Sequence, residues 1–159
     1  MPITLSNKER MLLEDEKSHE SMCIQKYTNY ANQTKDSQLK QLFQNNASVE
    51  QDHLNSINCI LNGEVPNLNS NQGTSKMNTA SIASSPNMSP VGMCEVRDED
   101  MCKDMLMAEK YISGVYNVSI FEFRDTNVRN VLNHIQKEEQ QHGEAIYKYM
   151  ENKGMYKVQ

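Results

Sequence analysis

The sequence predicts an all-α protein, a four-helix bundle built from two helical hairpins. Apolar residues recur at steps of three and four over four long stretches, which is the helical period. The inward-facing row of residues in the second pair of stretches repeats that of the first pair, and we call such a row a seam. A segment rich in Asn, Ser, Gly and Pro separates the two pairs. One helical hairpin cannot bury its apolar face alone, so we expect the two to close on each other as a single domain over residues 1–159.

The helices are expected near residues 7–33, 37–62, 97–124 and 126–153. Capping side chains or a glycine stand at the ends of these ranges: Ser6 with Glu9 as a capping box, Asp36 or Ser37, Gly63, Asp125 or Thr126, and Gly154. The first hairpin then covers about residues 7–63 and the second about 97–154, and residues 64–96 form a long crossover between them.

A run of acidic residues, 98–100, opens the third expected helix. Carboxylates suit a helix N-terminus because they oppose the positive end of the macrodipole. A cation site is the alternative, and we favour a solvent-exposed face because charge runs at helix starts usually serve that role.

Polar residues interrupt the apolar seam near the middle of each expected helix. Shifting the numbering by 89 places the first hairpin on the second, with these pairs: Glu20 on Glu109, Tyr27 on Tyr116, Glu50 on Glu139, and His53 on His142. Both copies contain a Glu and, thirty residues later, a Glu-x-x-His motif. Each hairpin turn lies about midway, so four glutamates and two histidines are expected at one height in the bundle interior.

Burying ionised carboxylates is costly unless an opposite charge compensates them. Four carboxylates and two neutral imidazoles match two divalent cations in charge, and this donor set suits iron or manganese, with zinc as a further candidate. A site without metal, held by hydrogen bonds, is the alternative. We favour metal because the motif is duplicated together with its upstream glutamate.

This pattern resembles the dinuclear carboxylate site of ferritin-like bundles. The resemblance implies that Glu50 and Glu139 bridge the two metals, that the other two glutamates are terminal ligands, and that each metal takes one histidine. Rubrerythrin-like proteins also place a tyrosine behind the terminal glutamates, which implies outer roles for Tyr27 and Tyr116. Open coordination positions would admit oxygen or peroxide.

The sequence departs from rubrerythrins in two respects. Ile112 stands where rubrerythrins have an additional glutamate, and the chain has no rubredoxin-type cysteine module to deliver electrons. Rubrerythrin-style peroxide reduction is therefore not expected.

Four further residues near the seam are weaker candidates: Glu16, His19, Cys23 and His134. Glu16 is either a gating ligand or a polar residue towards the end of the bundle, and we favour the polar residue. The two histidines are expected at the surface or its boundary, because their repeat partners are Ala108 and Asn45. Cys23 is expected to be a small core residue.

Composition argues against several other classes of function. The net charge of −5 is spread along the chain without a basic stripe, which argues against a nucleic-acid partner. No stretch approaches the roughly 20 apolar residues of a membrane helix, and the opening MPITLSNKER lacks the apolar region of a signal peptide. The four cysteines form no C-x-x-C pair, so we expect free thiols in a reducing compartment.

The second half of the chain also resembles the Coat F family of bacterial spore coat proteins. The resemblance covers about residues 100–157, through the stretches DMLMAEKYISGVYN and EFRDTNVRNVLNHIQKEEQQHGEAIYKYMENKGMY. The family's YM-x-x-x-G-x-Y element corresponds to Tyr149, Met150, Gly154 and Tyr156. The resemblance implies a protein made in the mother cell cytoplasm and assembled into the spore coat, with other coat proteins or with copies of itself.

Two hypotheses for the function follow. The first is a coat component with a dinuclear metal site and at most weak peroxide or oxygen chemistry. The second is a dedicated di-metal enzyme such as a manganese catalase, a peroxidase or a ferroxidase. We favour the first, because neither an electron-delivery module nor the surfaces of a storage cage can be recognised in the sequence.

Overall fold

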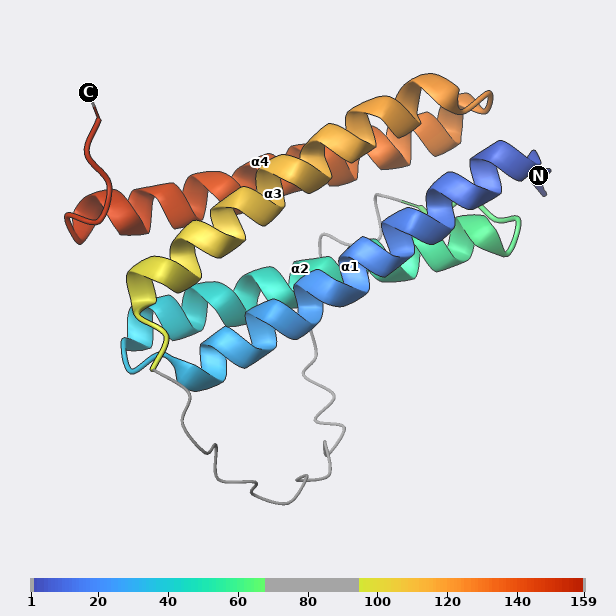
Figure 1. Ribbon diagram of the computed structural model, residues 1–159. Coiled ribbons are helices and arrows are strands. Elements are labelled where there is room, and N and C mark those ends of the chain that lie inside the picture. The colour runs from blue at the N-terminus through green and yellow to red at the C-terminus, as the bar shows by residue number, and fades with distance from the viewer. Residues whose placement is uncertain (1, 68–94, 159) are drawn as a thin grey trace, which may run out of the picture.

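The computed structural model describes residues 2–67 and 95–158, which form four long helices and no strand. The helices are α1 (Asn7–Gln33), α2 (Ser37–Leu61), α3 (Asp98–Glu122) and α4 (Thr126–Asn152). Their bounds agree with the predicted ranges to within two residues, and the prediction of a four-helix bundle is confirmed. Three residues separate the helices within each hairpin, so the partners run antiparallel (Figure 1).

The predicted caps explain most of the helix ends. Ser6 and Glu9 form the capping box of α1, and the carboxylates of Asp36 and Asp125 accept backbone N–H groups at the starts of α2 and α4. Gly63 and Gly154 adopt φ angles of +88° and +70° just beyond α2 and α4. Only glycine takes up this left-handed conformation at little cost, so these two residues turn the chain out of the helices.

The third helix ends two residues before the predicted position, at Glu122. Phe123 is already extended, with φ −86° and ψ 130°, and the backbone N–H of Arg124 donates to a Glu9 oxygen at 3.0 Å. The end of α3 therefore coincides with a contact to α1. The local sequence gives no signal for this contact.

The acidic residues at the start of α3 are partly exposed and take part in surface ion pairs. Arg97 donates to Asp100 at 2.9 Å, and Lys103 pairs with Glu99.

Helix α2 ends at one end of the bundle, and α3 begins at the other (Figure 1). At one end, where α2 finishes, the N–H of Ile3 donates to the carbonyl oxygen of Gly63 at 2.9 Å. At the other end, Lys35 pairs with Glu95 just before α3 begins. The long crossover predicted for residues 64–96 stays a prediction, because residues 68–94 lie outside the described part.

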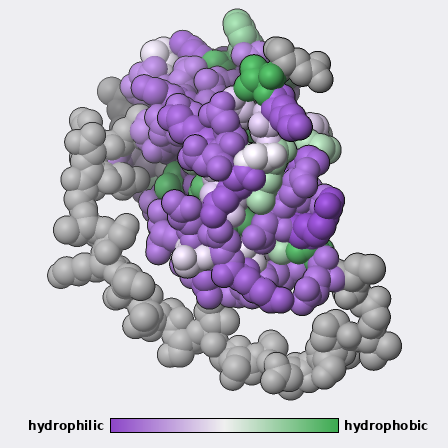
Figure 2. All heavy atoms as spheres, turned by 90° about the vertical axis from the view of Figure 1, so that its left-hand side faces the viewer, coloured by the Kyte–Doolittle hydropathy of each residue, from purple (hydrophilic) through white to green (hydrophobic). Residues whose placement is uncertain are grey.

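Apolar seams from all four helices meet in one core. The fully buried large side chains include Leu13, Tyr27, Leu39, Phe43, Ile57, Ile60, Met101, Met105, Tyr116, Leu132, Ile135 and Ile146. Val131, Met150 and Ser119 are buried as well. The end of the bundle seen in Figure 2 is largely hydrophilic, with only scattered hydrophobic residues.

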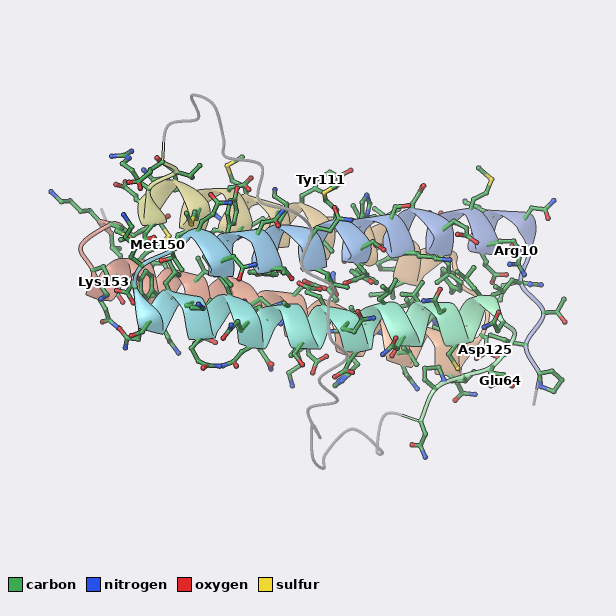
Figure 3. The ribbon with its side chains drawn as sticks, turned by 90° about the horizontal axis from the view of Figure 1, so that it is seen from below. Arg10, Glu64, Tyr111, Asp125, Met150 and Lys153 are labelled. Atoms are coloured by element: carbon green, nitrogen blue, oxygen red, sulfur yellow. The ribbon has the colours of Figure 1, made fainter. Side chains whose placement is uncertain are left out.

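Ion pairs and hydrogen bonds join the two hairpins near both ends of the bundle. Figure 3 shows Arg10 and Asp125 at one end, and Met150 and Lys153 at the other. Lys153 pairs with Asp36 at 2.7 Å, linking the end of α4 to the start of α2.

Within the described residues, none of the helices combines the length and apolarity that crossing a membrane requires.

Glu9 makes the most buried of these links. Its side chain is 3% exposed and accepts hydrogen bonds from the backbone of Ser6 and from the backbone and guanidinium of Arg124. The side-chain bond from Arg124 is the main reason why the pKa of Glu9 falls from 4.5 to about 2. The sequence predicted only the capping role of Glu9.

We expect Glu9→Ala to lower the free energy of unfolding by about 1–3 kcal/mol at pH 7, because it removes a buried charged acceptor and its bonds. A carboxyl whose pKa falls on folding stabilises the protein above its unfolded pKa. This stabilisation is therefore lost as the pH falls from about 4.5 towards 2, and the difference between wild type and variant should shrink over that range. Urea denaturation measures both, with Glu14→Ala on the exposed face of α1 as control; equal losses in the two variants would contradict the role of Glu9.

Candidate metal centre

Each hairpin brings a Glu-x-x-His motif on its second helix level with a glutamate on its first. Glutamate and histidine three residues apart lie on the same face of a helix, so both point into the core. The side chains singled out by the repeat are all at most 5% exposed: Glu20, Glu50, His53, Glu109, Glu139 and His142. The structure therefore brings together all six predicted site residues.

One imidazole nitrogen of His53 faces three of the glutamates. Its Nδ1 atom lies 3.0 Å from Glu139 Oε1, 3.2 Å from Glu50 Oε2 and 3.5 Å from Glu20 Oε2. These three carboxylates come from three different helices, so His53 lies where both hairpins meet.

His142 occupies the corresponding place on the other side of the centre. Its Nδ1 atom lies 3.2 Å from Glu50 Oε1 and 3.7 Å from both Glu109 Oε1 and Glu139 Oε2. The two imidazole rings stack with their centroids 5.8 Å apart and their planes 27° apart. The arrangement follows the internal repeat, with one histidine and one terminal glutamate on each side.

The potential ligand atoms form two overlapping groups. One contains Glu20, Glu50, His53 and Glu139, and the other contains Glu50, Glu109, Glu139 and His142. Within each group, one ligand atom of every member lies within 4.8 Å of the others. Glu50 and Glu139 belong to both groups, which is the arrangement expected of bridging carboxylates.

Protein hydrogen bonds leave many of these atoms unsatisfied. The buried polar atoms without a hydrogen-bond partner include Glu20 Oε2, Glu50 Oε1, Glu109 Oε2, both oxygens of Glu139 and both nitrogens of His142. Buried polar atoms normally have partners, so such a concentration of acceptors needs an explanation. Cations bound between them would satisfy them together.

Burial and the neighbouring histidines give the four carboxyl groups different pKa values. It raises the pKa of Glu20 well above its usual range, and that of Glu109 to about 9. Burial acts in the same direction on Glu50, but the nearby imidazoles of His142 and His53 outweigh it and lower the pKa of Glu50. The same two histidines outweigh the effect of burial on Glu139 and lower its pKa as well.

The pKa values of both imidazoles are raised. Burial disfavours their charge, but contacts with the surrounding carboxylates raise the pKa of His142 to about 11 and that of His53 well above its usual range. With protein groups alone, two carboxyl groups and both imidazoles would thus hold protons near neutral pH, beside two ionised carboxylates. Two divalent cations could replace those four protons, so the donor set fits a dinuclear centre in charge and chemical type.

Tyr27 and Tyr116 connect the terminal glutamates of the two hairpins. Tyr27 on α1 donates to Glu109 on α3, and Tyr116 on α3 donates to Glu20 on α1. Burial, together with the nearby carboxylates, raises the pKa of both phenols, so they stay protonated as donors. Asn46 adds a 3.1 Å bond to the Tyr27 oxygen. Each tyrosine thus fixes the glutamate of the other hairpin, a pairing that the spacing alone did not predict.

Glu138 is a site residue that the sequence analysis missed. Its Oε2 atom lies 2.9 Å from His53 Nε2, the nitrogen that points away from the centre. A carboxylate in this position fixes the orientation and tautomer of a ligand histidine. The repeat places Val49 opposite Glu138, so His142 receives no equivalent support from α2. Glu138 directly precedes the bridging Glu139, but its boundary position gave no signal in the helical period.

Glu16 lies fully buried on α1, one turn before Glu20. It accepts a 2.9 Å hydrogen bond from Ser119, and its other oxygen lies 3.6 Å from His19 Nδ1. Burial raises its pKa to about 7. Its absence from both ligand groups fits the interpretation as a polar residue beside the site rather than a metal ligand.

The remaining candidates lie where the sequence indicated. The side chains of His19 and His134 are 28% and 43% exposed, as expected at a boundary. Cys23 and Cys102 are buried and Cys59 is partly buried, all as free thiols, and Cys94 lies outside the described residues.

The chain was compared with known families, curated proteins and solved structures. The model of the Coat F domain matches residues 97–159, which comprise α3, α4 and the C-terminal segment. The match contains half of the centre, namely Glu109, Tyr116, Glu139 and His142, and covers less than half of the chain. No curated protein and no solved structure matches the chain. The second hairpin is therefore similar to a Coat F domain, as the sequence analysis expected.

Proposed function

We propose that this protein is a spore coat component of the Coat F type whose ferritin-like bundle binds two divalent metal ions. The observation that carries the metal proposal is the pair of overlapping four-residue groups that share Glu50 and Glu139. The Coat F match over the second hairpin supports the coat role. Synthesis in the mother cell cytoplasm and assembly on the spore belong to the same proposal.

Iron or manganese suits this centre better than zinc. The donors are four carboxylates and two imidazoles, without a thiolate. Burial and the nearby glutamates raise the pKa of the Cys23 thiol, so this residue stays protonated. Oxygen-rich sites with imidazole favour iron and manganese, whereas structural zinc sites usually have four ligands, often including cysteine. A pair of either metal supplies a two-electron change of oxidation state when bound.

A dedicated di-metal enzyme is the second candidate, and one observation favours it. A pocket between α3 and α4 is lined by both Glu109 and Glu139, so a small molecule has a place next to the centre. Against it, Tyr27, Tyr116 and Phe43 are fully buried around the ligands. We therefore expect slow peroxide or oxygen chemistry at most, alongside self-association or contacts with other coat proteins.

The purified protein should contain close to two metal ions per chain. His53→Ala and His142→Ala should each lose at least one, while His134→Ala, at the boundary, should retain both. Elemental analysis of protein prepared without added metal measures this. Wild-type protein without metal, and without uptake of added Fe²⁺ or Mn²⁺, would refute the proposal.

Chelation should lower the melting temperature at neutral pH, because four buried carboxyl groups then need protons in place of cations. Folding raises the pKa of Glu109 from 4.5 to about 9 and that of His142 from 6.5 to about 11, so the chelated protein binds more protons when folded than when unfolded. Its stability is therefore greatest at low pH and falls as the pH rises from these ordinary values towards the raised ones. The gap in melting temperature between metal-loaded and chelated protein should therefore widen from pH 5 to pH 8. A gap independent of pH would contradict this account.

The metal position beside His53 should bind more tightly because Glu138 orients this imidazole. We expect Glu138→Val, which copies the repeat partner Val49, to weaken one metal position about 10–100-fold and leave the other unchanged. Glu151→Val, at an exposed position of the same helix, is the control. Competition titration with a chelator resolves the two affinities, and equal weakening of both positions would argue against a specific role.

Oxygen release from hydrogen peroxide separates the two candidate functions. We expect slow release by Mn- or Fe-loaded protein, no release by Glu50→Ala, and unchanged release by Glu14→Ala. Turnover as fast as that of a dedicated catalase would favour the enzyme. Absence of release with either metal would leave the coat role alone.

A further inference from the structure

A pocket of about 510 Å³ opens between α3 and α4 beside the candidate metal centre. Its lining includes Glu109, Lys110, Glu139, Gly143, Tyr147 and Tyr156. Two of these residues, Glu109 and Glu139, belong to the same group of candidate ligands. The pocket therefore connects the outside of the second hairpin with one half of the centre.

Gly143 is the residue that keeps this pocket open. It lies inside α4, directly after His142 and one turn after Glu139. A Cβ atom built on Gly143 would lie 3.7 Å from Leu106 Cδ1 and 3.9 Å from Glu109 Cβ, which is ordinary van der Waals contact. A methyl group would thus just fit, and any larger side chain would occupy the space above Glu109.

Glycine inside a helix has a cost that calls for a reason. It destabilises a helix interior by about 1 kcal/mol relative to alanine. Because alanine fits at residue 143 without a clash, close helix packing does not require the glycine. Open space in front of the ligands is what the glycine provides.

The first hairpin lacks this feature at the matching position. The repeat places Leu54 opposite Gly143, and Ile24 opposite Ser113. Leu54 is partly buried on α2, directly after His53. The two sides of the centre thus differ: glycine follows the histidine whose nitrogens lack hydrogen-bond partners, and leucine follows the histidine that Glu138 supports.

The C-terminal segment builds part of the rim of the pocket. Gly154, with φ +70°, turns the chain after α4, and the N–H of Met155 then donates to Met150 at 2.8 Å. This turn brings Tyr156 against Tyr147, with ring centroids 5.2 Å apart and planes at 77°. The YM-x-x-x-G-x-Y element therefore shapes the mouth of the pocket, where Lys110 adds a positive charge.

We propose that this pocket is the route by which a small oxygen ligand, of the peroxide class, reaches the Glu109 and His142 half of the metal centre. The proposal rests on the metal centre proposed above. Gly143 keeps the route open, while the larger Leu54 stands at the matching position of the repeat in the other half. The two metal positions are consequently unequal: one is supported by Glu138, and the other accepts external ligands.

A graded series at Gly143 tests the route with azide as the probe. Wild type, Gly143→Ala, Gly143→Val and Gly143→Leu are loaded with Co²⁺, and azide binding is followed through the visible absorption of the metal. We expect the rate of azide binding to fall with side-chain size, by about tenfold or more for leucine, at unchanged cobalt content. Gly114→Leu is the matched control, because nothing lies within 4 Å of a Cβ atom at that exposed glycine of α3.

The outcomes separate this proposal from the metal proposal. Wild type that takes up no cobalt would refute the metal centre. Wild type with two cobalt ions, and the same azide rate across the series, would overturn the route. If leucine disturbs metal binding, the comparison between the alanine and valine variants decides in the same way, because alanine fits without a clash.

Discussion

The structure depends on one constraint: four glutamate side chains are buried at one level of a bundle whose core is otherwise mostly apolar. Each carboxylate is at most 2% exposed, so water does not compensate its charge. The surrounding residues respond to this constraint. The two histidines face the carboxylates, and the two tyrosines donate across the hairpins to the terminal glutamates. The layer is thus polar and ordered, in contrast to the apolar layers above and below it.

The internal repeat provides this layer twice, and its departures from symmetry give the two halves different properties. Glu138 and Val49 correspond in the repeat, as do Gly143 and Leu54. The first difference supports His53, and the second opens space beside Glu109. The half that contains His53 is therefore the better supported one, and the half that contains Glu109 is the more accessible one. Glu50 and Glu139 belong to both groups of candidate ligands, so the two halves share these residues while they differ elsewhere.

The sequence predicted the helices, their caps and the six central residues because each leaves a local or periodic signal. A capping box, a left-handed glycine and a Glu-x-x-His motif can be recognised within a few residues, and the repeat supplies the relative level of the hairpins. Glu138 and the bond between Glu9 and Arg124 were missed because they depend on how one hairpin lies against the other. The exchange of tyrosine partners between hairpins was missed for the same reason, since the spacing fixes the height of a phenol but not the helix it faces.

A metal centre here would serve assembly of the fold whether or not it does chemistry. Contacts within each hairpin are made by neighbouring helices, whereas the two hairpins meet across the layer of four buried carboxyl groups. His53 of the first hairpin lies 3.0 Å from Glu139 of the second, and His142 lies 3.2 Å from Glu50. Cations held between these groups would therefore tie one hairpin to the other. A stabilising role of this kind would fit the proposed coat function, because it needs no delivery of electrons.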